Sequence, residues 1–377
     1  MLKLYNKLRP YIIVLAVVVL STLVAWAPFL FRQTNWLGLR IDNANFQYIY
    51  RNFDGPLYIV PAKTLYNPQE IAKIGLELPL SPGYFAAHLP LYPILIRLFA
   101  PLLGYLKSMI LVNLVATTLL ACIFYYIIEK LNISKNPLLL TSLLLFLPRF
   151  LVVRSVGAPE SLFIFLILLS LYFFEKQDYL LAGIFGGLSA MTKTPGILLF
   201  AAYALTLGER YIRGKKIEWR SIGIFLIPFG FFLVFLLYAK QYGDFFAYFK
   251  SGDNIHLIAP YSAFNFHATW VGTAWLEDIV FYFFLYALTV VSLKDFKYRS
   301  FFYFALIFFT ATLFVQHRDI ARYSLSLWPL ALIAFERFFS SKKTLIAFLI
   351  LLPAIYMYAW NFMSYNVMPI SNWAPFL

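Results

Sequence analysis

Residues 11–31, YIIVLAVVVLSTLVAWAPFLF, form an apolar run directly after the charged N-terminal stretch MLKLYNKLRP. A helix needs about 20 apolar residues to cross the hydrocarbon core of a bilayer. The charged-then-apolar order also occurs in export signals, and Ala25 and Ala27 imitate a cleavage site. Pro28 follows directly, and the run is longer than a typical signal core, so we predict an uncleaved first transmembrane helix.

Similar runs recur along the 377 residues, which are 62% hydrophobic, 20% aromatic and only 13% charged. Soluble domains carry roughly 25% charged residues. In lipid, a membrane-spanning segment must satisfy its own backbone hydrogen bonds, which for apolar runs of this length favours the α-helix. We therefore expect an all-α polytopic membrane protein with about 11 transmembrane helices in one domain, residues 1–377. The expected spans are centred near 11–31, 107–129, 137–153, 159–175, 179–192, 195–208, 221–240, 276–293, 300–316, 323–338 and 344–360.

The formal net charge of +14 is distributed unevenly along the chain. One set of short loops is rich in Lys and Arg, most densely at RYIRGKKIEWR (210–220), which predicts that these loops and the N-terminus are cytoplasmic. Cations on the other side oppose this bias, and a bare charge within a span costs about 2.5–3.5 kcal/mol. These cations are Arg149, Arg154, Lys193, Arg318 and Arg322. They are too dispersed for a nucleic-acid surface, so no nucleic-acid partner is expected.

The segment 32–106 is predicted to be a long extracytoplasmic loop with juxtamembrane helices. Apolar residues spaced i, i+3, i+4 and i+7 between positions 46 and 53 predict a short interfacial helix. Asp42 or Asn43 would cap its start. A second interfacial or re-entrant helix is expected in AAHLPLYPILIRLF (86–99), where prolines at 90 and 93 prevent a regular start.

Asp54 would then lie at the C-terminal end of the first interfacial helix, where the helix dipole disfavours an anion by about 0.3–1 kcal/mol. Gly55 and Pro56 would end that helix and turn the chain. Asp54 could thus be an ordinary turn residue or a functional carboxylate, and the local pattern leaves both readings open.

Several motifs, in order along the chain, resemble the GPI mannosyltransferase II-like family of GT-C membrane glycosyltransferases. FDGPLYIVPAKTLY (53–66) is similar to its W-D-G-x-x-Y pattern, although Phe53 replaces the tryptophan. Pro61 and Leu65 also depart from that pattern, and Lys193 stands where arginine is common. The other matching segments are LPLYPILIRL (89–98), APESLFIFLILLSLYFFEK (158–176), LAGIFGGLSAMTKTPGILL (181–199), YAKQYGDFFAYFKS (238–251) and ARYSLSLWPLALIAF (321–335).

The resemblance implies an inverting glycosyltransferase that takes a sugar, expected to be mannose, from a polyprenyl-phosphate donor. It places the active site on the extracytoplasmic face, with the catalytic aspartate in the first external loop, a position that corresponds to Asp54. The acceptor would be a lipid-linked glycan or another extracytoplasmic group. The expected substrate-binding residues are Asp42, Tyr58, His88 and Glu160.

A departing lipid phosphate also needs positive charge, which arginine supplies as a fork and lysine as a point charge. The candidate phosphate-binding residues are Arg154, Lys193, Arg318 and Arg322. Structural alternatives exist, because Arg318 could pair with Asp319 and Arg154 with Glu160.

We expect no cofactor and no metal, because the four histidines lack ligand spacing and Cys122 is the only cysteine. Besides donor, acceptor and membrane lipids, an accessory membrane subunit is a conceivable partner. The main alternative function is a lipid or oligosaccharide transporter or flippase, although transporters usually place ionisable groups near the bilayer midplane. A non-catalytic assembly subunit, and a related enzyme that transfers another sugar or modifies protein hydroxyls, are further alternatives.

Overall fold

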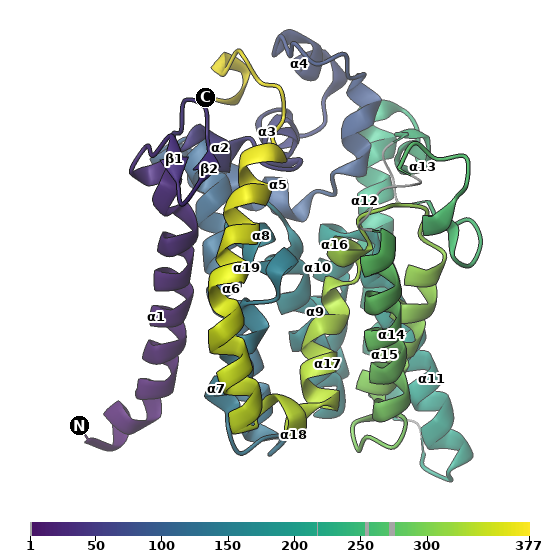
Figure 1. Ribbon diagram of the computed structural model, residues 1–377. Coiled ribbons are helices and arrows are strands. Elements are labelled where there is room, and N and C mark those ends of the chain that lie inside the picture. The colour runs from purple at the N-terminus through teal and green to yellow at the C-terminus, as the bar shows by residue number, and fades with distance from the viewer. Residues whose placement is uncertain (1, 217, 253–255, 271–275) are drawn as a thin grey trace. The chain divides into compact units, whose positions relative to one another are not determined.

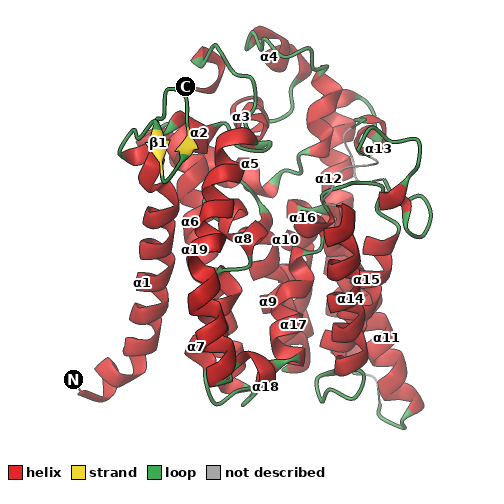
Figure 2. Cartoon of the chain, in the orientation of Figure 1, coloured by secondary structure: helices red, strands yellow, loops and turns green. Residues whose placement is uncertain are grey.

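A computed structural model describes residues 2–216, 218–252, 256–270 and 276–377, of which almost all the regular structure is helical (Figures 1 and 2). The chain forms two compact units. Unit 1 comprises Met1–Phe165, Val234–Gly252 and Arg337–Leu377, and unit 2 comprises Leu166–Leu233 and Asp253–Glu336. The expectation of one domain over residues 1–377 stays a prediction.

Unit 1 contains most of the N-terminal half of the chain and the C-terminal helix. Its elements are α1 (Leu2–Leu30), β1 (Asn35–Trp36), β2 (Leu39–Arg40), α2 (Gln47–Tyr50), α3 (Gly55–Thr64), α4 (Pro68–Lys73), η1 (Pro82–Ala87), α5 (Leu91–Leu103), α6 (Tyr105–Lys130), α7 (Pro137–Leu145), α8 (Pro148–Val153), α13 (Ala247–Lys250), α19 (Lys342–Tyr365) and η6 (Ala374–Phe376). The two strands pair antiparallel, with Asn35 opposite Arg40.

Unit 2 is assembled from the middle of the chain. Its elements are α10 (Tyr179–Thr192), η2 (Thr194–Ile197), α11 (Leu198–Ile212), η3 (Trp219–Phe225), η4 (Ser262–Phe264), α14 (Leu276–Leu293), α15 (Arg299–Leu313), α16 (Ile320–Tyr323), η5 (Leu325–Leu327) and α17 (Trp328–Ala334). Three further helices contain residues of both units: α9 (Glu160–Glu175), α12 (Leu226–Tyr242) and α18 (Glu336–Phe339).

Five helical stretches of the described chain are long and apolar enough to cross a membrane. They are Asn6–Leu30, Tyr105–Lys130, Trp219–Tyr242, Leu276–Leu293 and Lys342–Tyr365, and each coincides with an expected span. The other six expected spans are shorter or interrupted; for example, the one at 137–153 is divided into α7 and α8. The chain is a multi-pass membrane protein.

The segment 32–106 is built differently from the expectation at its start. The first predicted interfacial helix is reduced to the four residues of α2, and Asn45, not Asp42, accepts a hydrogen bond from its first N–H, that of Gln47. The second predicted helix is confirmed as α5. Its buried residues pack against α3 and α6, while Leu98 and Leu102 are 66% and 82% exposed.

Small residues allow α10 to approach η3 and the start of α12 closely in unit 2. Gly183 and Gly187 are four residues apart on one side of α10, the spacing that favours close helix contact in membranes. A Cβ atom on Gly187 would lie 2.6 Å from the carbonyl oxygen of Leu226. The backbones, rather than side chains, therefore form this contact.

Replacing Gly187 by Ala should lower the free energy of unfolding by about 1–3 kcal/mol, because the added methyl group overpacks this contact. Gly208→Ala is the matched control, since a Cβ there meets nothing within 4 Å. That helical substitution should be neutral or stabilising by up to about 1 kcal/mol. Detergent unfolding curves of both variants measure the difference, and equal stability would contradict close packing at Gly187.

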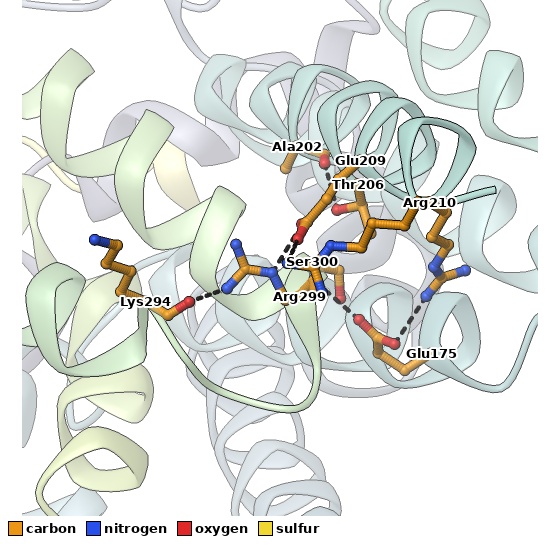
Figure 3. Close-up of polar contacts among 9 residues, drawn as sticks. Glu175, Ala202, Thr206, Glu209, Arg210, Lys294, Arg299 and Ser300 are labelled. Atoms are coloured by element: carbon orange, nitrogen blue, oxygen red, sulfur yellow. Dashed lines mark hydrogen bonds and ion pairs between the residues drawn. The ribbon is translucent and has the colours of Figure 1, made fainter. Parts of the chain in front are cut away.

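An ion-pair network links residues of α9, α11 and α15 at the ends of the expected spans (Figure 3). Arg210 Nη2 lies 3.0 Å from Glu175 Oε2, and Arg299 Nε lies 2.8 Å from Glu209 Oε2. The amide of Ser300, at the start of α15, donates to Glu175 Oε1. Burial alone would raise the pKa of Glu209, but the hydrogen bond and charge of Arg299 outweigh it and lower the pKa.

Because the pKa of Glu209 is lower in the folded protein, its stabilising effect is present at neutral pH and is lost as pH falls through the folded-state value. We expect Glu209→Gln to lower the free energy of unfolding by about 1 kcal/mol at pH 7. The difference from wild type should shrink below about pH 4. Glu70→Gln is the control, because the Glu70–Lys73 pair is exposed. A Glu209→Gln effect that does not depend on pH would contradict the ion-pair assignment.

Candidate functional site

Asp54 lies at the start of a helix rather than at the end of one. It is the N-terminal cap residue of α3, and Gly55 and Pro56 are the first residues of that helix. The prediction that Gly55 and Pro56 end a helix was therefore wrong, because Pro is well accommodated in a first helical turn, where its missing N–H is not needed. A carboxylate at a helix N-terminus is favoured by the helix dipole, the reverse of the expected penalty.

The backbone of Phe53, the residue before Asp54, is left-handed, with a φ of 48°. Such a conformation is uncommon for a bulky residue. It costs roughly 1–3 kcal/mol and persists only where the surrounding structure imposes it. The Phe53 ring packs on Phe362 of α19 with a centroid distance of 5.4 Å. The strained residue is therefore anchored by a helix that is distant in the sequence.

The first turn of α3 approaches the segment between α8 and α9 closely. A Cβ atom on Gly55 would lie 2.8 Å from the carbonyl oxygen of Gly157 and 3.2 Å from the sulfur of Met109. Only glycine fits here without movement. This contact brings the Asp54 backbone close to the segment that leads into Glu160.

Tyr58 and His88, both predicted substrate-binding residues, contact each other in unit 1. Their rings are edge to face with centroids 4.7 Å apart, and Tyr58 also contacts Tyr92 at 5.1 Å. Tyr58 lies about one helical turn after Asp54 on α3. His88 is 3% exposed, and its carbonyl oxygen accepts a hydrogen bond from the Tyr66 hydroxyl.

Glu160 joins the same neighbourhood through Tyr92. Glu160 is 2% exposed at the first residue of α9. Burial raises the pKa of the Tyr92 hydroxyl well above its ordinary value, and the charge of Glu160 adds to this rise. The structure thus gathers Asp54, Tyr58, His88 and Glu160 around α3, a group that we call the α3 cluster.

Asp42, the remaining predicted substrate-binding residue, has a different environment. Its side chain is 80% exposed and pairs with Arg40 at 3.2 Å, and its carbonyl oxygen accepts a hydrogen bond from Tyr48. These local contacts support the turn between β2 and α2. The role of Asp42 in substrate binding stays a prediction.

Arg154, a predicted phosphate-binding residue, is fully buried in unit 1. Its guanidinium donates hydrogen bonds to the hydroxyl groups of Ser21 and Thr22 at 2.7 and 2.8 Å, and to the carbonyl oxygen of Leu145 at 2.9 Å. These bonds connect α1, α7 and α8, so they give Arg154 a structural role that the sequence did not indicate. Its phosphate-binding role stays a prediction.

Arg149 was not selected among the four phosphate-binding candidates, yet it lies beside the Phe53 anchor. Its guanidinium carbon is 4.1 Å from the centroid of the Phe362 ring, which in turn contacts Phe53. The signal that could have identified it was present, because Arg149 opposes the topological charge bias. What the sequence could not give was the contact with Phe362, more than 200 positions away.

The other three predicted cations belong to unit 2. Lys193 Nζ is 5.7 Å from the centroid of the Tyr323 ring, so Lys193 lies next to the short helix α16 that carries Arg322. His317 contacts the same tyrosine at 4.9 Å. Arg318 is exposed just before α16. Lys193 and the 317–323 segment therefore form a local cluster of basic and aromatic residues.

Among the described residues, no group of three or more His, Cys, Asp or Glu side chains could hold a metal ion. The expectation of a metal-free site stays a prediction. The α3 cluster instead offers two carboxylates, a phenol hydroxyl and an imidazole, which are groups suited to proton transfer and to hydrogen bonding with a polyhydroxylated substrate.

The sequence matches no protein-family model and no curated protein. Among solved structures, the chain is similar to ArnT from Cupriavidus metallidurans bound to undecaprenyl phosphate, with a TM-score of 0.56 and 13% sequence identity. The similarity covers 90% of this chain and 63% of ArnT, so the chain spans less than two thirds of that protein.

The chain has a GT-C-type fold. The expected all-α, polytopic GT-C architecture is thereby confirmed. Membership of the GPI mannosyltransferase II-like family stays a prediction, because the similarity at 13% identity concerns the fold alone.

Phe53 offers a direct test of the strained backbone. Phe53→Asn and Phe53→Val both remove the ring, but Asn tolerates a left-handed conformation and Val does not. We expect the Val variant to be less stable than the Asn variant by about 1–3 kcal/mol. The control pair is Tyr211→Asn and Tyr211→Val in α11, because Asn and Val have similar helix propensities. Equal stabilities of the two Phe53 variants in detergent unfolding would argue against strain.

Proposed function

We propose that the protein is a glycosyltransferase that moves a sugar from a polyprenyl-phosphate donor to an extracytoplasmic acceptor, with Asp54 as the general base. Two observations support this proposal. The fold is similar to that of ArnT, whose solved structure contains undecaprenyl phosphate. The observation that carries the role of Asp54 is its position in the α3 cluster, directly after the strained Phe53.

The chemistry requires one well-placed base. An acceptor hydroxyl must lose its proton as it attacks the anomeric carbon, and a carboxylate within hydrogen-bond reach can accept that proton. The new glycosidic bond forms as the bond to the lipid phosphate breaks, through an oxocarbenium-like state of the sugar. Attack opposite the leaving group inverts the anomeric centre. The phosphate departs as an anion, so it requires no general acid.

Buried polar groups of the α3 cluster are the proposed contacts for the sugar or acceptor. Tyr58 lies on α3, His88 contacts it, and Glu160 is buried at the start of α9. Asp42 is a weaker candidate because its carboxylate is exposed and paired with Arg40. We retain mannose as the proposed sugar and a lipid-linked glycan as the proposed acceptor. Both rest on the sequence resemblance.

Cations are the proposed ligands of the donor phosphate, since fixed positive charge lowers the barrier where negative charge develops. The proposal retains Lys193, Arg318 and Arg322 in unit 2, and it adds Arg149 in unit 1. Arg154 is the weakest of the set because its donors already bind Ser21, Thr22 and Leu145. The proposed orientation places the N-terminus in the cytoplasm and segment 32–106 outside.

Asp54→Asn should lower transfer from a polyprenyl-phosphate sugar by about 10²–10⁴-fold, the usual contribution of a general base, while the protein remains folded. The assay offers lipid-phosphate mannose, glucose and arabinose, each radiolabelled, to enzyme reconstituted in lipid vesicles. Glu70→Gln is the control, because this carboxylate lies in the same segment but pairs at the surface with Lys73. Turnover of the Asp54→Asn variant at the wild-type rate would remove Asp54 from the mechanism.

The same vesicles distinguish the proposed transferase from the main alternative, a flippase. A flippase would move labelled lipid between leaflets without forming a glycosidic product, and the Asp54→Asn variant would keep that movement. If the wild-type protein transfers sugar and the transfer does not depend on Asp54, the protein is still a glycosyltransferase, but Asp54 is not its general base.

A further inference from the structure

We propose that residues 366–377 form a strap that fixes both ends of α3, and that Asn52, whose side chain bonds to α19 just before the strap, is a positioning residue for Asp54. This inference rests on the proposed function, because it concerns the orientation of the proposed base. The C-terminal segment, yellow in Figure 1, lies at the same end of unit 1 as α2 and α3.

At the N-terminal end of α3, the strap pairs with the backbone just before Asp54. Asn52 and Val367 form an antiparallel bridge. Two hydrogen bonds flank it: the Met368 amide donates to the Arg51 carbonyl at 2.8 Å, and the Phe53 amide donates to the Asn366 carbonyl at 3.4 Å. The second bond acts directly on the residue with the left-handed backbone.

The Asn52 side chain connects this turn to α19. It is fully buried, and its Nδ2 donates to the Met363 carbonyl at 2.8 Å, near the C-terminal end of that helix. A buried amide that bonds to a distant helix restrains position more strongly than a local turn bond, because both partners belong to packed elements. Asn52 therefore links the end of α19, the start of the strap and the residue pair 53–54.

At the other end of α3, Lys63 holds the far part of the same strap. Its Nζ donates to the carbonyl oxygen of Pro375 at 3.0 Å and to the backbone oxygen of Leu377 at 2.7 Å. Between the two ends, the Ser371 hydroxyl donates to the Glu77 carboxylate in the loop after α4. The strap thus crosses from the turn just before α3 to the last turn of that helix.

The need for such a device follows from the strain at Phe53. A left-handed phenylalanine relaxes unless several contacts determine its conformation. Relaxation would turn the first residues of α3 and displace the Asp54 carboxylate. Misplacement of a reacting group by about 1 Å can cost about 10²-fold in rate while ground-state binding is retained.

The test compares Asn52→Ala with Asn45→Ala, a change in the same segment that removes side-chain hydrogen bonds confined to residues 43–47. We expect Asn52→Ala to lower kcat about 10–100-fold, with a KM for the lipid-phosphate sugar within about twofold of wild type. Hydrogen exchange of the amides at 51–57 should be faster than in wild type. Asn45→Ala should leave kcat and this exchange close to wild type.

A milder variant covers the case in which loss of the buried Asn52 amide unfolds the protein. Lys63→Met removes the far attachment of the strap, together with the cation–π contact of Lys63 with Tyr105. Its expected effect is a several-fold lower kcat at unchanged KM, with faster exchange at residues 371–377. Lys73→Met is its control, since Lys73 pairs with Glu70 at the surface.

The outcomes separate the two proposals. If Asp54→Asn is inactive but Asn52→Ala and Lys63→Met have normal kcat, the positioning role is rejected and the proposed base stands. The positioning role is likewise rejected if exchange accelerates with no change in kcat, or if KM rises in place of the fall in kcat. If Asp54→Asn is fully active, Asp54 is rejected as the base, and its positioning by Asn52 is rejected with it.

Discussion

The left-handed backbone of Phe53 is the constraint on which the candidate site depends. It turns the chain so that α3 begins at Gly55 with Asp54 as its cap residue, where the sequence had predicted the end of a helix. Glycine at position 55 then allows this turn to contact the backbone of Gly157. A carboxylate, a helix N-terminus and the segment before Glu160 are brought together by one residue in an unfavourable conformation, so the surrounding contacts must supply the energy that it costs.

Contacts between helices in this protein are of the kinds that stabilise helix packing in a membrane. Apolar side chains gain little by leaving lipid for one another, so helices associate by close packing and by hydrogen bonds. Unit 2 has both kinds of contact. Glycines of α10 pack against η3 and α12, and the Glu175–Arg210 and Glu209–Arg299 pairs lie at the ends of the spans. Unit 1 uses the buried Arg154 guanidinium in the same way, to connect α1, α7 and α8.

The sequence predicted what depends on composition and length. The long spans and the amphipathic helix α5 follow from apolar residues at regular spacing, and these were found. The start of α3 was misjudged because Asp-Gly-Pro suits both the end of one helix and the beginning of the next, and local chemistry cannot choose between them. The grouping of Tyr58, His88 and Glu160 was not visible either, since contacts between distant residues fix it.

Arg149 and Arg154 illustrate why a charge alone does not identify a site in a membrane protein. Both oppose the topological bias and lie five positions apart, yet only Arg154 was selected as a phosphate-binding candidate. The buried Arg154 guanidinium donates hydrogen bonds to two hydroxyl groups and a carbonyl oxygen, so it contributes to helix packing. Arg149 instead lies beside an aromatic ring, with its guanidinium carbon 4.1 Å from the centroid of Phe362. The two arginines therefore differ in their surroundings, which their positions along the chain do not reveal.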